Sequence, residues 1–304
     1  MSSIDQLQFV FVTGKGGVGK TTVSAALAKN LAARGRRVLV ALSGAKERLS
    51  TLFSVAPLGT EIRSIAPNIS AVKLTADVAL REYGGMVLRS RAVYNAVFDN
   101  KYVKSFFSAV PGLSEWAVLG KAWYHSTETL PDGSRRFDVV LFDAPATGHG
   151  LDMLRVPKVI VDVVPPGLLR RDAERAWTMF RDPAQSGVVI VTQPEDMPTN
   201  ETLELVAALR GELGLPLAML VINSVLEPLF DDAERAELLV PRQLDRNEPG
   251  DEAVACGIRR AIRERVQSAS LAKLASIQAP RVELPLLLVD AATPAAIQRL
   301  ADRF

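Results

Sequence analysis

The chain has 304 residues, of which 48% are hydrophobic and 23% are charged, a composition typical of a folded globular protein with one or two domains. Its 36 lysines and arginines nearly balance 34 acidic residues, and no long basic run is interleaved with aromatic residues, so we predict no nucleic acid partner. A single cysteine, Cys256, excludes an intrachain disulfide, and two histidines leave too few ligands for a zinc site within one chain.

The N-terminal segment MSSIDQLQF lacks the basic and apolar regions of a secretory signal. Farther along, the apolar stretch 156–169 is interrupted by Pro157, Pro165 and Pro166 and by two charged residues. We therefore expect no membrane insertion, and a reducing cytoplasm fits the single cysteine best.

The first strong motif is GKGGVGKTT at residues 14–22, which lies between an apolar strand at residues 9–13 and a helical pattern from Val23. Glycines at this spacing let successive backbone N–H groups curl around a polyphosphate, which a Cβ would obstruct. Lys20 would reach the β- and γ-phosphate oxygens, and Thr21 would offer its hydroxyl to Mg²⁺. The sequence therefore predicts a nucleotide-binding phosphate loop (P-loop). Its glycines are Gly14, Gly16, Gly17 and Gly19.

A second lysine, Lys15, follows the first glycine of the motif. In this position it resembles the signature lysine of the deviant P-loop in MinD-like and related dimeric NTPases. In that class the lysine reaches across a dimer interface to the partner's nucleotide. We interpret Lys15 in the same way, in preference to an exposed loop lysine without a role.

Two segments with different patterns come next. Residues 38–42 form a short apolar run, typical of a strand buried in a parallel sheet. Residues 76–130 carry apolar side chains at helical spacing, which predicts a helical insertion on a nucleotide-binding core. Within the insertion, the stripe Val93–Phe107 is either the insertion's own core, which we favour, or a groove for an apolar helix.

The strand predicted at residues 137–142 leads directly into Asp143. An acidic residue at the carboxyl end of a parallel strand is placed to sense Mg²⁺ and the γ-phosphate, so we interpret Asp143 as a site residue in preference to a cap. Strands at residues 188–192 and 217–222, with the helical stretch 201–213 between them, continue the alternation. This pattern predicts an α/β fold with a doubly wound, mostly parallel sheet.

The C-terminal third begins at Asn223, which would either bind an adenine edge or form a turn. We expect a second helical segment over about 226–278, packed on the core of a single domain, residues 1–304. A short helix within Thr293–Phe304 ends the chain, and we expect it to pack on the core as well.

Together these motifs resemble the ArsA/Get-type family of anion-transporting ATPases over nearly the whole chain. They are GKGGVGKTT, ALREY ending at Tyr83, PGLSE from Pro111, FD and TGH between Phe142 and His149, TQPE and ET between Thr192 and Thr202, VIN ending at Asn223, and ELPL from Glu283. The P-loop is specific for the class, and the TGH and PE with ET elements are typical of this family.

The resemblance implies ATP or ADP with Mg²⁺ as the bound groups, and a catalytic part for Lys15, Lys20 and Asp143. Thr21 and Asp143 would hold the metal. The phosphate cradle would run from Gly16 to Thr22, with Val18 and Thr22 included. Switch II would consist of Asp143 with Thr147, Gly148 and His149. The adenine would be held by Asn223 and the loop of Leu284, Pro285 and Leu286.

The sequence departs from the family at switch I, where the pattern D-P-A-H-x-L supplies an Asp for the attacking water. Here residues 44–49 are GAKERL, so Gly44 occupies the Asp position. Loss of such a group commonly costs about 10² to 10⁴ in rate, so we predict tight ATP binding with slow hydrolysis. Glu47 lies three residues farther on, and we do not expect it to compensate.

A second departure concerns the C-x-x-C zinc clasp found in part of the family. Ala253 replaces its first cysteine, and Cys256 is its only remaining one. Two chains would supply two thiolates where a structural zinc site uses four ligands. We therefore expect neither a zinc-clasped dimer nor arsenite transport.

We predict an ATP-switched dimer with weak ATPase activity that acts on an apolar protein client. It would be a homodimer or a heterodimer with a catalytically complete ArsA-like paralogue. One alternative is a nucleotide-bound regulatory scaffold that never hydrolyses ATP. Another is a MinD-type membrane-positioning ATPase, which would need Thr293–Phe304 as a membrane helix.

Overall fold

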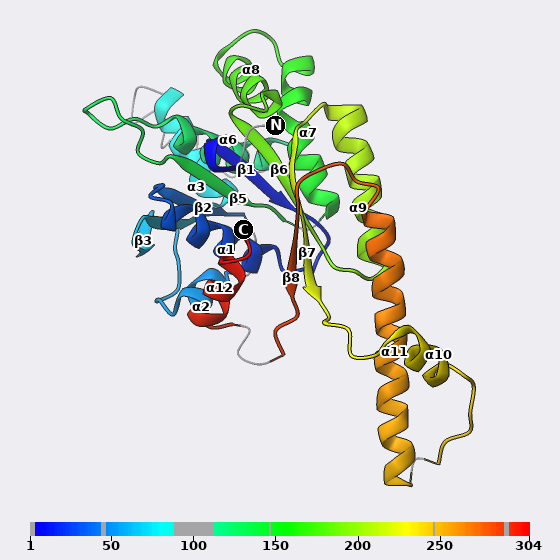
Figure 1. Cartoon of the computed structure of the whole chain (residues 1–304). Helices are drawn as coiled ribbons and strands as arrows, with labels where there is room; N and C mark the ends of the chain where they lie inside the picture. Colours follow the sequence, from blue (N-terminus) through cyan, green and yellow to red (C-terminus); the bar gives the residue numbers. More distant parts are fainter. Residues whose placement is uncertain (1–3, 44–46, 88–111, 146, 246, 289–291) are drawn as a thin grey trace.

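The structure, a computed structural model, describes residues 4–43, 47–87, 112–145, 147–245, 247–288 and 292–304. It contains an eight-stranded sheet in the order β3-β4-β2-β5-β1-β6-β7-β8, with helices on both faces (Figure 1). All neighbouring strands pair in parallel except β3 and β4. This arrangement confirms the doubly wound, mostly parallel α/β class predicted from the sequence.

The elements have the following bounds. The strands are β1 (Phe9–Thr13), β2 (Val38–Leu42), β3 (Arg63–Ala66), β4 (Ile69–Lys73), β5 (Val139–Asp143), β6 (Ser186–Thr192), β7 (Leu217–Val225) and β8 (Arg281–Pro285). The α-helices are α1 (Lys20–Ala33), α2 (Leu49–Phe53), α3 (Ala76–Val87), α6 (Leu113–Thr127), α7 (Thr147–Val163), α8 (Leu168–Arg181), α9 (Asp196–Ala208), α10 (Asp232–Leu238), α11 (Pro249–Leu274) and α12 (Pro294–Ala301). Two short turns add a 3-10 helix at Ile4–Gln6 and a π-helix at Leu209–Leu213.

The two faces of the sheet bury separate apolar clusters. On β1, Phe9 and Phe11 point into the cluster covered by α6, α7, α8 and α9, where the Phe9 ring centroid lies 4.9 Å from that of Phe180. Val10 and Val12 point into the opposite cluster, beneath α1, α2 and α12. Because both faces are covered, the central strands are apolar at nearly every position, which made them easy to find in the sequence.

Two strands, β3 and β4, lie between residues 43 and 136, where the sequence pattern predicts none. β3 is four residues long and forms the edge of the sheet, with Arg63 and Ser64 exposed. An edge strand buries little, so its sequence needs no apolar run. This position explains why the pattern was inconspicuous.

The apolar stretch 156–169 belongs to two helices. α7 contains Pro157 in its interior, and α8 begins two residues after Pro166. Across the part of the chain that the structure describes, no helix is long and apolar enough to span a bilayer.

The last helix, α12, packs on the core. Its residues Ile297, Leu300 and Ala301 are at most 2% exposed, and α12 lies against α1. These are the side chains that a membrane-binding helix would have to expose.

The expected insertion at residues 76–130 is described at its two ends. α3 and α6 pack against each other, and Trp116 and Leu119 of α6 belong to the core cluster. The stripe Val93–Phe107 lies outside the described residues.

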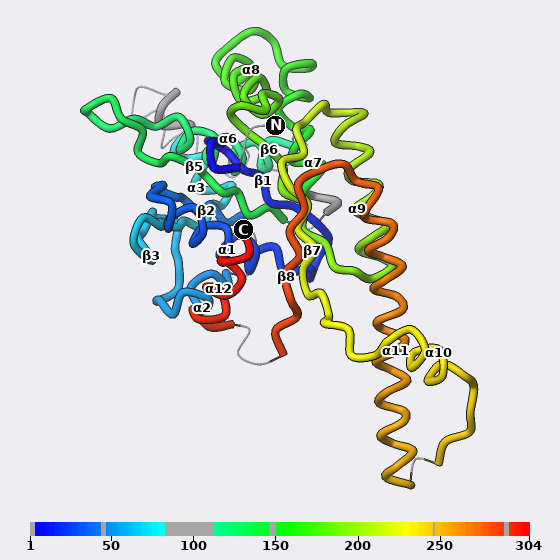
Figure 2. The backbone as a smooth tube through the Cα atoms, in the orientation of Figure 1, coloured from blue at the N-terminus to red at the C-terminus, as the bar shows by residue number. Residues whose placement is uncertain are grey.

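The segment 226–278, which we expected to pack on the core, does so only in its C-terminal part. α11 is 26 residues long, and only its C-terminal half lies against the core, where it packs on α9 and buries Leu274 (Figure 1). Its N-terminal half extends away from the sheet together with α10, as Figure 2 also shows. We call residues 226–262 the arm.

Gln267 ties the start of the arm to α11. Its side chain forms two hydrogen bonds with the backbone of Leu226, accepting from the N–H at 2.8 Å and donating to the carbonyl at 2.8 Å. Leu226 lies three residues beyond Asn223 on the same chain segment. The arm is therefore anchored immediately next to the residue expected to contact the adenine.

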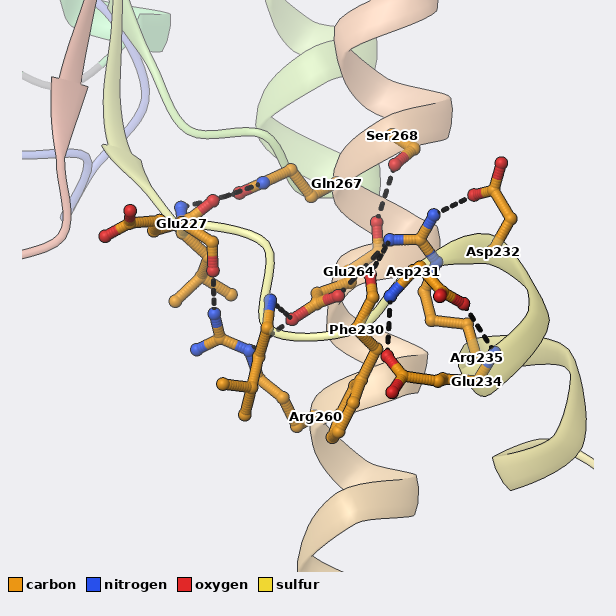
Figure 3. Close-up of polar contacts among 12 residues, drawn as sticks. Glu227, Phe230, Asp231, Asp232, Glu234, Arg235, Arg260, Glu264, Gln267 and Ser268 are labelled. Carbon is orange, nitrogen blue, oxygen red and sulfur yellow. Dashed lines mark hydrogen bonds and ion pairs between the residues drawn. The ribbon is translucent and has the colours of Figure 1, made fainter.

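Glu264 holds the next part of the arm in place, as Figure 3 shows in close-up. Its side chain is 2% exposed and accepts hydrogen bonds from the Leu229 N–H at 2.8 Å, from Arg260 Nε at 2.7 Å and from Arg235 Nη1 at 3.3 Å. Burial alone would raise the pKa of Glu264, but these donors outweigh it and hold the pKa below its usual range. Glu264 is thus a buried carboxylate that holds the arm to α11.

Candidate functional site

Two glycines of the P-loop have positive φ angles and pack closely against neighbouring strands. Gly14 has φ 145°, and a Cβ there would lie 2.0 Å from the Val191 carbonyl oxygen of β6. Gly19 has φ 94°, and a Cβ there would lie 2.3 Å from Asn223 Nδ2 of β7. Neither position can accept a side chain, so the glycine spacing serves packing against the neighbouring strands as well as access to phosphates.

The remaining loop residues differ in exposure. Gly16 and Gly17 are exposed at the tip of the loop, Gly17 with φ 88°, whereas Val18 is buried in the core beside α1. Thr22 lies in the first turn of α1. Gly19 caps this helix without a side chain, so the first backbone N–H groups of α1 remain available to an anion.

Lys20 lies inside the curve of the loop. Its Nζ donates hydrogen bonds to the carbonyl oxygens of Gly14 at 2.9 Å and Lys15 at 3.0 Å. Burial lowers the pKa of Lys20, and the charge of Asp143 opposes this effect. The ammonium group is therefore a partly desolvated cation at the centre of the cradle.

Asp143, the last residue of β5, meets the first turns of α1. Thr21 Oγ1 donates to Asp143 Oδ2 at 2.6 Å, and Ser24 Oγ donates to Oδ1 at 3.3 Å. Asp143 is only 6% exposed, and this burial raises its pKa to about 6, although the bonds from Thr21 and Ser24 and the charge of Lys20 lower it. The structure brings the predicted metal-site pair, Thr21 and Asp143, into direct contact.

These residues fit a magnesium nucleotide. Mg²⁺ takes oxygen ligands and is usually held by one or two protein oxygens together with substrate phosphates, which matches Thr21 and Asp143. No cluster of three or more His, Cys, Asp and Glu side chains suited to a metal occurs among the described residues. A site of this kind does not require one, because phosphate and water complete the coordination.

Asn223 lies within β7, which continues to Val225. Its Nδ2 donates to the Val18 carbonyl oxygen at 2.9 Å, so the side chain bridges β7 and the P-loop. The Leu286 N–H donates to the Val225 carbonyl oxygen at 2.8 Å, which places the predicted adenine loop beside the same end of β7. Pro285 and Leu286 are half-buried there, but Leu284 is fully buried in the core of the α1 face.

Lys15 contacts Glu201, which the sequence identifies only as part of the ET motif. Its Nζ lies 2.6 Å from Oε1 of Glu201, on α9. Sequence reasoning also missed Ser24, although its spacing of three residues from Thr21 places both on one side of a helix. No local sequence pattern predicts the pairing of Lys15 with Glu201, because the two residues are 186 positions apart.

The switch segments are described in part. α7 begins at Thr147, and its Gly150 packs tightly on the end of β1, where a Cβ would lie 2.7 Å from Thr13 Oγ1. The side chains of Thr147 and His149 lie outside the described residues, as does Gly44. Glu47 is described, and its carboxylate accepts from the Ser50 N–H at 2.8 Å at the start of α2.

The parallel sheet, the P-loop and the contact between Thr21 and Asp143 define a P-loop nucleotide-binding protein. The sequence pattern of the anion-transporting ATPase (ArsA) family matches residues 7–165, and the chain belongs to this family. This confirms the resemblance on which the sequence analysis relied.

Proteins with similar sequences support this family assignment. The chain is 28% identical to the ATPase BagA of Mycobacterium tuberculosis over 93% of this chain and 88% of that protein. It is 32% identical to an arsenical pump-driving ATPase of Escherichia coli, over 72% of this chain but only 39% of that protein. A putative arsenical pump-driving ATPase of Halobacterium salinarum is 28% identical over 75% of this chain and 37% of its own length. ATPase activity is therefore the general activity of the class.

We expect Asp143→Asn to stabilise the protein in EDTA without nucleotide. A carboxyl whose pKa is about 6 in the folded protein, against about 3.9 when unfolded, favours folding less as the pH rises through this range. At pH 8 the free energy of unfolding should rise by up to about 3 kcal/mol, and the gain should shrink towards pH 4. Urea unfolding at both pH values would measure it.

Asp138 provides a control of opposite sign. It precedes β5, pairs with Arg37 at 2.8 Å, and the hydrogen bond from Arg37 holds the pKa of Asp138 below its usual range. Asp138→Asn should therefore lower the free energy of unfolding at pH 8. A loss of stability in Asp143→Asn at pH 8 would contradict the assigned burial.

Proposed function

We propose that the protein is an ATP-binding, nucleotide-switched dimer with weak intrinsic ATP hydrolysis. It would act on a protein client, together with a catalytically complete paralogue. The observation that carries this proposal is the convergence of Lys20, Thr21 and Asp143 around one glycine loop. Membership of a family whose relatives are named as ATPases supports it.

Each residue of the loop has a distinct part in binding. The N–H groups of the P-loop and of the first turn of α1 would bind the phosphates, and Lys20 would exchange the carbonyls of Gly14 and Lys15 for phosphate oxygens. Thr21 and Asp143 would hold Mg²⁺, which supplies positive charge to the phosphates when bound. Asn223, already in contact with the Val18 carbonyl, would border the base.

Slow hydrolysis is supported by the residues near switch I. Gly44 offers no group to orient water, and Glu47 is engaged by the N–H groups of Ser50 at 2.8 Å and of Leu58 at 3.4 Å. A carboxylate that already accepts two backbone N–H groups is not available to the attacking water without the loss of those hydrogen bonds. This chain would therefore bind ATP tightly and hydrolyse it slowly.

The dimer and the client are further parts of the proposal. Lys15 occupies the signature position of dimeric members, and a paralogue with a complete switch I would supply the turnover that this chain lacks. The proposed client is an apolar protein, which the alternative interpretation of the stripe Val93–Phe107 as a groove for an apolar helix would accommodate. The apolar side chains of α12 are packed in the core, so membrane positioning through this helix is the less favoured alternative.

We expect Gly44→Asp to raise the steady-state rate of ATP hydrolysis at least about tenfold, because an aspartate there restores a water-positioning carboxylate. Gly44→Asn is the matched control, since it has the same shape without the charge. Phosphate release would be measured for each chain alone and mixed with a relative that carries the switch I aspartate. Brisk turnover by the unmodified chain alone would contradict weak hydrolysis.

The same experiment separates the regulatory scaffold from a slow enzyme. A scaffold would bind ATP with Mg²⁺ and form no ADP over days, alone or mixed. A slow enzyme would convert its bound ATP to ADP in a single turnover.

A further inference from the structure

The P-loop lysine Lys15 is held by a carboxylate of its own chain. Its Nζ lies 2.6 Å from Oε1 of Glu201, 186 residues away in the sequence. The Lys15 side chain is 24% exposed and that of Glu201 is 34% exposed, so the pair is partly shielded from water. Such shielding makes an ion pair stronger than one on an open surface.

The topology explains why the two residues meet. Glu201 lies in the second turn of α9, which follows β6, and β6 pairs directly with β1. The P-loop leaves the carboxyl end of β1, so α9 begins beside it. The Thr192–Thr202 segment that carries the TQPE and ET motifs therefore passes along the loop and delivers one carboxylate to it.

Lys15 is fixed at two points. Its carbonyl oxygen accepts a hydrogen bond from Lys20 Nζ at 3.0 Å, and its ammonium group is paired with Glu201. The pair neutralises the charge of Lys15 and limits how far its side chain extends from the loop. To bind an anion on another molecule, the Lys15 ammonium has to leave Glu201.

We propose that Glu201 is a latch, a positioning residue that keeps Lys15 on its own chain until a second, nucleotide-loaded chain displaces it. A polyphosphate carries more negative charge than one carboxylate, so it can compete for the ammonium group. This inference rests on the proposed dimer. It makes dimer formation depend on the exchange of Glu201 for a phosphate group of the partner's nucleotide.

The test uses Glu201→Gln, which keeps the shape of the side chain and removes its charge. In nucleotide-free protein, acylation of Lys15 by acetic anhydride, followed by peptide mass spectrometry, should become about three to ten times faster, as expected for loss of one ion pair. With ATP and Mg²⁺, analytical ultracentrifugation should give a dimer Kd lower by a similar factor. Glu204→Gln is the matched control, because Glu204 is exposed on the same helix.

The outcomes separate the latch from the dimer. Weaker dimerisation of Glu201→Gln than of the unmodified chain would overturn the latch and assign Glu201 the opposite role of aiming Lys15 at the partner. Unchanged acylation of Lys15, or equal dimerisation of both chains, would also overturn the latch alone. If acylation rises but no chain dimerises with ATP, the proposed dimer fails and the latch fails with it.

Discussion

Lys20→Ala is expected to weaken binding of ATP with Mg²⁺ by about 100-fold or more, because a hydrogen bond from an ammonium group to a charged oxygen contributes about 1.5–3 kcal/mol and Lys20 would form two. The ammonium already lies in the loop, within hydrogen-bond distance of the Gly14 and Lys15 carbonyls. Isothermal titration calorimetry would measure the Kd, and circular dichroism would check that the fold is kept.

Lys29→Ala is the matched control for this experiment. Lys29 lies on the same helix, α1, but its Nζ donates to the Pro294 carbonyl oxygen at 3.2 Å, away from the loop. Its loss should leave the affinity for ATP unchanged. An affinity of Lys20→Ala within about threefold of the unmodified chain would contradict the assignment of the loop as the phosphate site.

The second large effect is a loss of local stability where the arm is held to α11 by Glu264. Glu264→Ala would leave Arg235, Arg260 and the Leu229 N–H without their shared acceptor, in surroundings where Glu264 itself is 2% exposed. Breaking a buried charge pair commonly costs about 3–5 kcal/mol, and the partial exposure of both arginines favours the lower end. Hydrogen exchange of the amides in residues 226–240 would measure the loss of local stability.

Two further variants make this prediction specific. Glu264→Gln retains an acceptor for the Leu229 N–H and should cost less than Glu264→Ala. Glu237→Ala, at an exposed position on α10, should leave the protection of the arm unchanged. Equal protection in Glu264→Ala and Glu237→Ala would show that the buried carboxylate does not hold the arm.

The arm is joined closely to the strand that carries Asn223. β7 carries Asn223, and Leu226 of the same segment is held to α11 by two hydrogen bonds with the side chain of Gln267. The carboxyl end of β7 and the arm are therefore connected by three residues of chain and one side chain.

Part of the site could be predicted because its information is local. Gly14 to Thr22 follow one another, and the turn that they form is dictated by glycine spacing between a strand and a helix. Asp143 could be found in the same way, because an apolar run ends at an acidic residue. The contact between Thr21 and Asp143, 122 residues apart, then follows from the parallel sheet, in which β1 and β5 are neighbours.

Other features could not be predicted, because each depends on which surfaces meet. The Glu47 carboxylate accepts a hydrogen bond from the first turn of α2, and the Leu284 side chain is fully buried in the core. The edge strand β3 has too little burial to leave a pattern. The projection of α11 is equally hidden, since a basic helical pattern looks the same whether the helix lies on a core or extends beyond it.

By itself, the sequence determined the α/β class, the P-loop, the acidic strand end and the family, because these depend on short patterns of backbone geometry and burial. Only the tertiary structure decided that Gly14 packs against β6, that Lys15 pairs with Glu201 of α9, and that Glu264 holds the arm. Those contacts join segments far apart in the chain. Their energies depend on distance and shielding from water, which exist only once the sheet has brought the segments together.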